Sequence, residues 1–247
     1  GTLNVQRTLT LNQNSADHLN SGSINITGGD LIVTQSGSTP SFSTVGTIEI
    51  AATRTLTVNG GTLNYDGGTL GGAGQLSLNS TTANLTPDFS NTTTALAVSA
   101  STINGPGTLT NVATLNLRAS TVNTNLVNQG LLLVTPESGA ASTINGTLTS
   151  AANSIIRVQS NHNIGGTSLT VANGFTNHGL IELTQVNGTN GFAATLIVSN
   201  GTLTNAPEAT IDVLAGSGGL RTLTAQLDNQ GTLNVQRTLT LNQNSAD

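Results

Sequence analysis

The chain has 247 residues, of which 35% are hydrophobic, 2% aromatic and 7% charged, with a formal net charge of −5. Its basic residues are all arginines and are scattered, so the clustered Lys and Arg of a nucleic-acid-binding surface are absent. The lack of cysteine excludes disulfides and thiolate metal sites. No apolar run of about 18 residues predicts a membrane span. We therefore expect neither a nucleic-acid partner nor membrane insertion.

Short β-strands are predicted along the whole chain, because Leu, Val and Ile alternate with Thr, Asn and Ser in segments of three or four residues. No stretch repeats apolar residues at helical spacing, and the abundant Thr, Asn, Ser and Gly favour strands and turns. In order, the predicted strands are residues 3–5, 8–11, 23–26, 31–33, 47–50, 55–58, 62–65, 75–78, 96–98, 108–110, 114–117, 131–134, 147–149, 155–158, 169–171, 180–183, 195–198, 202–204, 210–213, 221–224 and a final pair that repeats the first two.

A longer motif indicates how these strands are connected. Asn-Gly and Gly-Gly pairs between the strands would, taken alone, predict hairpins. However, the pattern apolar-x-Asn-x-Gly-x-aliphatic-x-aliphatic recurs at residues 126–134, 175–183 and 227–235, with a weaker version at 203–213. The last three occurrences start at Phe175, Leu203 and Leu227, which are 28 and 24 residues apart. Such periods are typical of solenoids, in which each coil buries its apolar face against its neighbours.

The predicted fold is therefore all-β, a parallel β-helix (β-solenoid). Inward Leu, Val and Ile would form a thin core that needs few aromatic side chains, and outward Thr would pack on flat sheets. Asparagines at the corners would stack so that each side-chain amide binds the next.

The first seventeen residues, Gly1 to Asp17, are repeated without change as Gly231 to Asp247, an offset of 230 residues. We interpret residues 1–230 as one full solenoid unit of a tandem array and residues 231–247 as the start of the next, identical unit. At ~24 residues per coil and ~4.8 Å per stacked strand, one unit would contain about ten coils and measure roughly 46 Å.

Two glycine-rich segments, Gly72-Ala-Gly-Gln-Leu-Ser-Leu78 and Gly105-Pro-Gly-Thr-Leu-Thr110, together with the Asn-x-Gly units, resemble repeats of exported bacterial β-helix proteins. These are autotransporter passengers and filamentous-haemagglutinin-like adhesins. The resemblance covers most of the chain and rests on glycine and alternation. It implies a right-handed β-helix at the cell surface, used for adhesion or as a stalk. The secretion cap and the translocator barrel of those families do not occur in this sequence.

No catalytic, cofactor-binding or metal site is predicted. His18, His162 and His178 lie far apart and lack the spacing of a metal site. Gly28-Gly-Asp30 is similar to one coil of a calcium-binding nonapeptide array, but the Asp does not recur at nine-residue spacing. Glu182 and Asp212 occupy equivalent outward positions of similar strands, so they could meet on adjoining coils, and we expect solvated surface there.

Function is expected to be structural: a repeat of a giant extracellular fibre or stalk-like surface adhesin that acts as a stiff spacer. Identical units would stack end to end, and the low surface charge would permit fibres to bundle side by side. The alternative is an adhesive passenger that binds carbohydrate or a partner through its Thr/Asn face or through loops such as 36–45 or 81–94. An ice-binding face of Thr-Leu-Thr segments is disfavoured because their spacing is uneven. An enzyme would need a pocket where two or more carboxylates converge.

Overall fold

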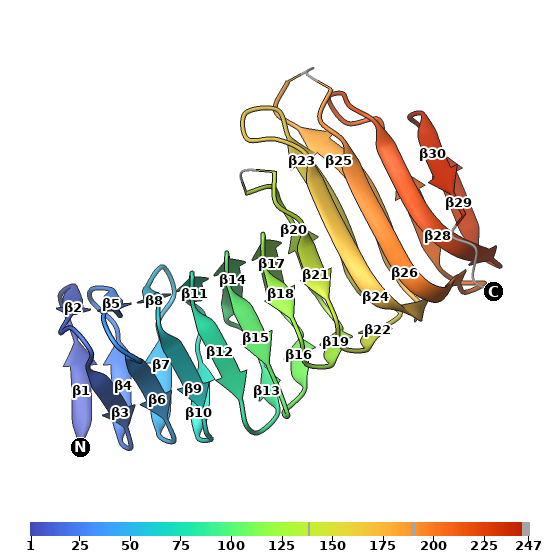
Figure 1. Cartoon of the computed structure of the whole chain (residues 1–247). Coiled ribbons are helices and arrows are strands. Elements are labelled where there is room, and N and C mark those ends of the chain that lie inside the picture. Colours follow the sequence, from blue (N-terminus) through green and yellow to red (C-terminus); the bar gives the residue numbers. More distant parts are fainter. Residues whose placement is uncertain (138, 189–190, 244–247) are drawn as a thin grey trace.

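The computed structural model describes residues 1–137, 139–188 and 191–243, and within them the chain is all-β, with thirty strands and no helix. Each strand pairs in parallel with the equivalent strand of at least one adjoining coil, so the chain winds into a β-solenoid with β1 at one end and β30 at the other (Figure 1). The predicted all-β parallel β-helix is confirmed.

Three faces surround the core, and the chain visits them in the order face I, face II, face III. Face II consists of β2 (Leu9–Leu11), β5 (Leu31–Thr34), β8 (Thr55–Asn59), β11 (Gln75–Asn79), β14 (Ala95–Ser99), β17 (Thr114–Arg118), β20 (Leu131–Val134), β23 (Ile155–Asn161), β25 (Leu180–Val186), β27 (Thr210–Val213) and β29 (Thr232–Val235). Face III consists of β3 (Asp17–Asn20), β6 (Ser41–Thr44), β9 (Thr62–Tyr65), β12 (Thr82–Leu85), β15 (Thr102–Asn104), β18 (Thr121–Val122), β21 (Ser142–Ile144), β24 (Thr167–Asn177), β26 (Ala194–Asn205), β28 (Arg221–Asn229) and β30 (Leu239–Asn242).

Face I is divided into three parts. Its strands are β1 (Thr2–Val5), β4 (Ser23–Ile26), β7 (Thr47–Ile50) and β10 (Thr69–Gly71), then β13 (Phe89–Ser90), β16 (Leu109–Asn111), β19 (Leu126–Asn128) and β22 (Leu148–Ser150). In the last coils β24, β26 and β28 continue around the corner, so their second halves form face I, with register shifts near Asn173 and Ile197.

The core follows directly from the alternation in the sequence. Along β8, for example, Leu56 and Val58 are buried, while Thr55, Thr57 and Asn59 lie at the surface. In-register pairing then places buried aliphatics above one another, as in the column Leu56, Leu76, Leu96. This column is the ladder of inward side chains expected for a thin solenoid core.

The predicted turn segments mark corners of the solenoid, as the turn after β8 shows, because the strands that it joins belong to adjoining faces and pair only in parallel. Asn59-Gly60-Gly61 turns the chain from β8 to β9, with positive φ at both glycines. The next coils make the same turn with Ser80, Ala100 and Ala119 at φ values of 51°, 48° and 48°. Turn residues therefore mark changes of face here, in agreement with the solenoid interpretation.

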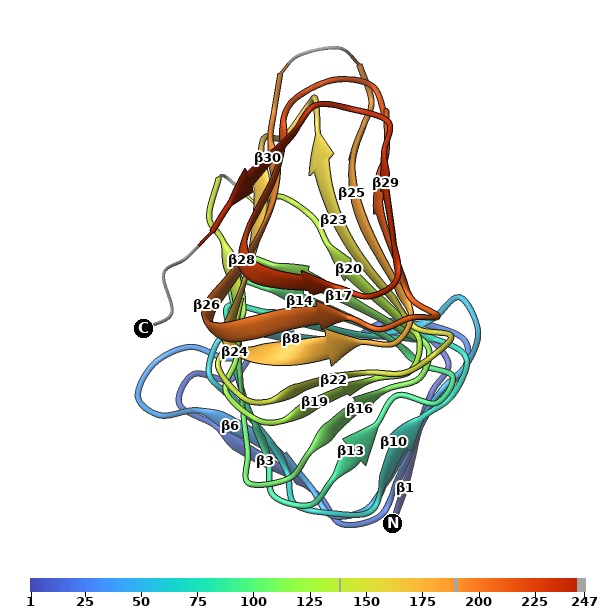
Figure 2. The same cartoon turned by 90° about the vertical axis from the view of Figure 1, so that its right-hand side faces the viewer.

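Coil length varies more than the predicted value of about 24 residues. Leu115 pairs with Leu132 only seventeen positions later, whereas Ile181 pairs with Ile211 thirty positions later. The long coils carry β23 to β28, and their extra residues form a lobe that rises above the rest of the stack (Figures 1 and 2).

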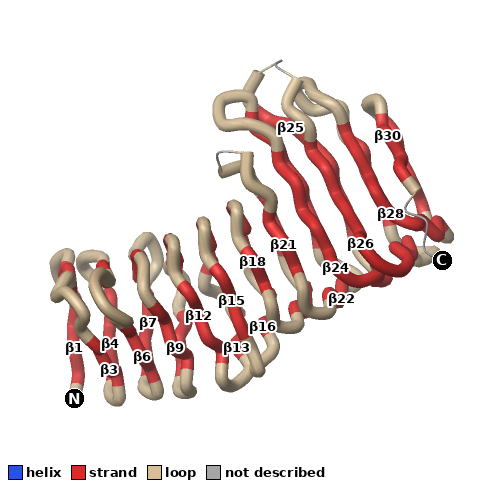
Figure 3. The backbone as a smooth tube through the Cα atoms, viewed as in Figure 1, coloured by secondary structure: helices blue, strands red, loops and turns tan. Residues whose placement is uncertain are grey.

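Every predicted strand is present, but the prediction missed nine: β3, β6, β10, β12, β13, β15, β18, β19 and β21. Figure 3 shows the strands of successive coils, in red, joined by loops and turns, in tan. One consequence is a correction, because residues 81–94 are not an irregular loop: they contain β12 and β13, which pair with neighbouring coils. Residues 36–45 likewise contain β6, which pairs on both sides. Neither segment can be deleted without opening the stack.

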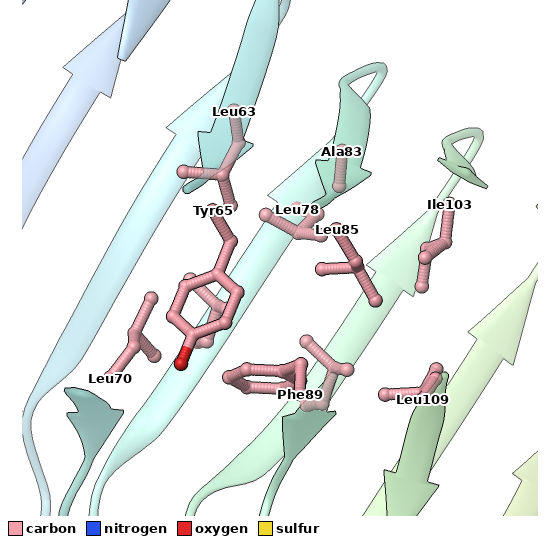
Figure 4. A pocket seen from close by; sticks show the side chains of 11 residues that line it. Leu63, Tyr65, Leu70, Leu78, Ala83, Leu85, Phe89, Ile103 and Leu109 are labelled. Carbon is pink, nitrogen blue, oxygen red and sulfur yellow. The ribbon is translucent and has the colours of Figure 1, made fainter. Parts of the chain in front are cut away.

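Face I is interrupted between β10 and β13, and a small cavity of about 20 Å³ lies behind the break. The ring of Tyr65 meets that of Phe89 edge to face, with ring centroids 5.2 Å apart. Only apolar surface lines the cavity, which includes Leu70 and Ala83 (Figure 4). Water needs polar partners, so a cavity of this size and lining stays dry and forms no ligand site.

Filling this cavity should stabilise the protein. We expect Ala83→Val to raise the free energy of unfolding by about 0.5–1 kcal/mol, because the added methyl groups enter an apolar void. Denaturant unfolding measures the change. The matched control is Ala97→Val on β14, where the side chain points outward and the change should stay near zero. A loss of stability in the Ala83 variant would show that the void cannot accept a methyl group.

Candidate functional site: polar ladders and open ends

A ladder of asparagines, all of them buried except the exposed Asn229 at its end, marks the corner between face I and face II. Within each of its two runs, the side-chain amide donates from Nδ2 to Oδ1 of the asparagine in the next coil, at 2.7–2.9 Å. Between the two runs, the Ser150 hydroxyl donates to Asn177 Oδ1. The runs are Asn91, Asn111 and Asn128, then Asn177, Asn205 and Asn229. The prediction that corner asparagines stack amide to amide is confirmed.

This corner explains the Asn-x-Gly motif. Asn177 donates to the carbonyls of Gly179 and Thr210 and accepts from the Gly179 N–H, which closes the turn into face II. The first apolar residues of three occurrences, Phe175, Leu203 and Leu227, are direct strand partners. The motif therefore encodes the end of a face I strand, the corner, and the start of a face II strand.

A second buried ladder, made of hydroxyl groups, follows the corner between face II and face III. The backbone N–H of one residue donates to the hydroxyl of the next coil, in the order Thr81, Ser101, Ser120 and Ser142. The sequence analysis missed it, although a signal exists: Ala-Ser-Thr recurs at residues 100–102, 119–121 and 141–143. Each of these serines is buried inside the corner.

A third ladder lies outward on face III. Asn145, Asn123, Asn104 and Asn84 each donate from Nδ2 to the asparagine of the preceding coil, ending on Asn64. The distances range from 2.7 to 3.2 Å. This row is part of the Thr/Asn surface that the sequence predicts.

The carboxylates Glu182 and Asp212 are direct strand partners on adjoining coils, as the sequence suggested they could be. Both have other partners, because Glu182 forms an ion pair with Arg157 and Asp212 accepts from Asn234 Nδ2 at 2.8 Å. Glu182 is only 8% exposed, so it is less solvated than expected. The pair belongs to an outward ladder of charged and amide groups on face II.

Two open grooves each contain a pair of carboxylates. One lies between β10 and β13 and includes Glu49 and Asp88, and the other includes Glu208 and Asp212. Asp88 already accepts the Thr108 N–H at 2.7 Å. In the described residues no group of three or more His, Cys, Asp or Glu could hold a metal ion.

The histidines, the Gly28-Gly-Asp30 segment and the Thr-Leu-Thr segments are dispersed over the solenoid. His18 lies on β3 in register with Phe42, His162 lies in the lobe, and His178 lies in the corner after Asn177. Asp30 accepts the Thr55 N–H at 2.9 Å, so the Gly28-Gly-Asp30 segment ties two coils together. The Thr-Leu-Thr segments lie on all three faces: on face I at residues 108–110, 147–149 and 202–204, on face II near 8–10 and at 55–57, and on face III at 222–224 and near 238–240.

Two buried groups have shifted pKa values without forming a reactive centre. Burial raises the pKa of the Tyr65 phenol, whose hydroxyl donates to the Gly68 carbonyl at 2.9 Å. Burial, and then repulsion by Arg237, lower the pKa of the Arg221 guanidinium. Arg221 donates to four backbone carbonyls and so organises the lobe.

Because the pKa of Tyr65 is raised, we expect the protein to lose stability at alkaline pH. Its folded-state pKa lies above the unfolded value of 10.0, so the folded state retains the phenolic proton more tightly. The contribution of the protonated Tyr65 phenol to the free energy of unfolding is fully present below pH 10.0 and is lost as the pH rises through the folded-state pKa. We expect the loss in the wild type and not in Tyr65→Phe, measured by denaturant unfolding. Tyr65 is the chain's single tyrosine, so its phenolate absorbance must also titrate above that pH; titration at the ordinary pKa would contradict the assignment.

Both ends of the stack expose unpaired strands, and each end carries one copy of the seventeen-residue repeat. At the first end, β1 and β2 lie on faces I and II. At the other end the same sequence forms β29 and β30, on faces II and III. Apolar side chains are exposed there, including Leu3 at 38%, Val235 at 53% and Leu241 at 49%.

In the part of the chain that the structure describes, no helix has the length and apolar character to cross a membrane. No protein-family model, no curated protein and no solved structure matches this chain.

Proposed function

We propose that this chain is a structural repeat of a long extracellular fibre or stalk-like surface adhesin, in which it acts as a stiff spacer. The observation that carries the proposal is that face II and face III run without interruption through a chain whose residues 1–17 recur unchanged as residues 231–247. The units would continue the stack and so cover the open edges.

The ladders support a mechanical role. Backbone hydrogen bonds link every coil to the next, and amide and hydroxyl ladders reinforce two of the three corners along part of the stack. Bending or shearing one coil would leave buried polar groups unpaired, at about 1–3 kcal/mol for each group. Stiffness then needs neither disulfides nor metal ions.

The proposal is tested by electron microscopy of native material together with the mass of the polypeptide under denaturing conditions. Residues 2–5 and 232–235 are separated by ten coils and one further face, so at ~4.8 Å per coil one unit would extend the fibre by about 50 Å. Fibres with that axial repeat and a chain many times 24.8 kDa are the expected result. Discrete particles that form no fibres would contradict the spacer function.

An adhesive passenger is the second candidate, and the lobe favours it. Ile164, Phe192 and Leu220 lie in its loops in three successive coils and are 48%, 37% and 56% exposed. Backbone hydrogen bonds hold these loops side by side, from the Thr167 N–H to the Ala193 carbonyl and from the Ala194 N–H to the Leu220 carbonyl. A row of exposed apolar side chains is typical of a contact surface.

Substitution at the lobe separates the two functions. Under the adhesive function, Phe192→Ser should reduce the attachment of protein-coated beads to immobilised polysaccharides or cell surfaces, with fibres unchanged. The matched control is Val45→Ser, since Val45 is 47% exposed in the part of the stack remote from the lobe. Equal attachment of the wild type and both variants would contradict the adhesive function and leave the spacer function as the only candidate.

A further inference from the structure

The two copies of the repeat show how the same strand pairs along each of its two edges. In the first copy, β1 pairs with the coil that follows, through β4, and in the second copy β29 pairs with the coil that precedes, through β27. If the unit is followed by itself, as the proposed array requires, residues 232–235 must pair with β27 on one side and with a copy of β4 on the other. The two observed pairings can be superimposed on the shared strand.

The length of the chain fixes the face on which this strand lies. β28 ends on face I at Asn229, and β29 begins at Thr232. Only two residues separate them, whereas the shortest coil takes seventeen. The repeat therefore cannot return to face I and must form face II, so every strand of a following unit is shifted by one face.

The inward columns fit this shift. Ile211 pairs with Leu233, and Leu3, which is the same residue of the repeat, pairs with Ile24. The second strand behaves alike, since Leu223 pairs with Leu241 and its equivalent Leu11 pairs with Val33. Inward positions thus meet inward positions. Val5, covered by a following coil, is 2% exposed, while its equivalent Val235 has no following coil and is 53% exposed.

The outward amides also fit. Asn234 Nδ2 donates to Asp212 Oδ1 of the preceding coil at 2.8 Å. Asn4, the equivalent residue, uses its Oδ1 to accept from Asn25 Nδ2 of the following coil, also at 2.8 Å. One asparagine can make both bonds, because donor and acceptor atoms differ, and both bonds run in the same direction along the axis.

The corner ladder continues across the joint. The Ser23 N–H donates to the Gly1 carbonyl, and a Cβ on Gly22 would lie 2.0 Å from that oxygen, so Gly22 lies directly against Gly1. Gly1 is equivalent to Gly231, and two residues before Gly22 and Gly231 stand Asn20 and Asn229. Asn20 donates onward to Thr44 Oγ1 at 3.1 Å, in the same direction as the ladder that ends at Asn229.

We propose that successive units join in one continuous solenoid and that each unit is rotated by one face, about a third of a turn, relative to the unit before it. The inference rests on the proposed array. Face I of each unit continues face II of the preceding unit, and its Asn20 extends the ladder from Asn229. The lobes of three consecutive units therefore point in three directions, and the pattern returns after about 150 Å at ~4.8 Å per coil.

The test uses a chain in which residues 1–230 precede the full 247 residues. The protein has no cysteine, so an introduced pair reports one contact. In the rotated joint, Asp228 of the first copy lies beside Leu19 of the second, both pointing outward. The variant with Asp228→Cys in the first copy and Leu19→Cys in the second should form a disulfide, because adjacent strands lie within disulfide reach.

The rival pair carries Thr224→Cys in the first copy with the same Leu19→Cys, and it would meet only if the second unit were not rotated. Both pairs span similar lengths of chain and should close at similar rates in denaturant. Under native conditions we expect the rotated pair to close about ten-fold faster than the rival or more. Faster closure of the rival pair overturns the rotation and leaves the array intact.

Thermal unfolding of the two-unit chain without cysteines gives a second measurement. A continuous joint covers two exposed ends, so the two units should unfold together at a midpoint above that of the 247-residue chain. If neither pair closes faster than in denaturant, the proposed joint is wrong. If the midpoint also equals that of the 247-residue chain, the spacer function fails as well.

Discussion

Replacing Asn177 by alanine should lower the free energy of unfolding by about 3–5 kcal/mol. The side chain is 0% exposed. It donates to the carbonyls of Gly179 and Thr210 and to Asn205 Oδ1, and it accepts from the Ser150 hydroxyl and the Gly179 N–H. Alanine would leave several of these partners buried and unpaired, at about 1–3 kcal/mol each before relaxation.

Asn64→Ala is the matched control, since Asn64 also belongs to an asparagine ladder and bonds to both neighbouring coils. Asn64 lies outward on face III, where water can replace the lost partners, so its loss should stay below about 1 kcal/mol. Denaturant unfolding of both variants checks the difference. Equal losses would mean that burial at the corner adds nothing to the ladder.

The strand pattern could be predicted because it depends on local alternation. Leu56 and Val58 lie on one side of β8, and the same alternation is seen in β11, where Leu76 and Leu78 are buried. The missed strands carry a weaker or inverted signal: β3 points Leu19 outward at 68% exposure and His18 inward beside Phe42, and in β12 one of the two inward residues is the small Ala83. Such strands are held by pairing with two neighbouring coils, which the local sequence does not reveal.

The corner asparagines could be predicted from their recurrence before glycine, whereas the hydroxyl ladder needed the spacing of three Ala-Ser-Thr segments to be noticed. The face on which each segment lies was beyond local reasoning. Coils take between seventeen and thirty residues, so a face cannot be assigned by counting a fixed period from Gly1 to Gly231. For the same reason two identical seventeen-residue segments lie on different faces.

Replacing Arg221 by methionine should destabilise the lobe by about 2–3 kcal/mol. The guanidinium is buried and donates to the carbonyls of Leu183, Ala215, Gly218 and Leu220 at 2.7–3.2 Å. Methionine fills much of the volume but leaves these carbonyls without a donor, and only part of that cost is offset by removing a buried charge. The amides of residues 214–220 should then exchange hydrogen faster, because the loop loses its central donor.

The same tetrapeptide elsewhere in the chain provides the control. Arg-Thr-Leu-Thr also begins at Arg54, whose guanidinium donates to the hydroxyl of the neighbouring Thr53 at 3.4 Å in an exposed turn. Arg54→Met should therefore change stability by less than about 0.5 kcal/mol. Hydrogen exchange and denaturant unfolding measure both variants. If residues 214–220 stay protected without the Arg221 guanidinium, the backbone hydrogen bonds of Leu214 and Ser217 suffice to hold the lobe. Identical tetrapeptides thus contribute differently to the free energy of unfolding, because the lobe buries Arg221 while Arg54 lies in a surface turn.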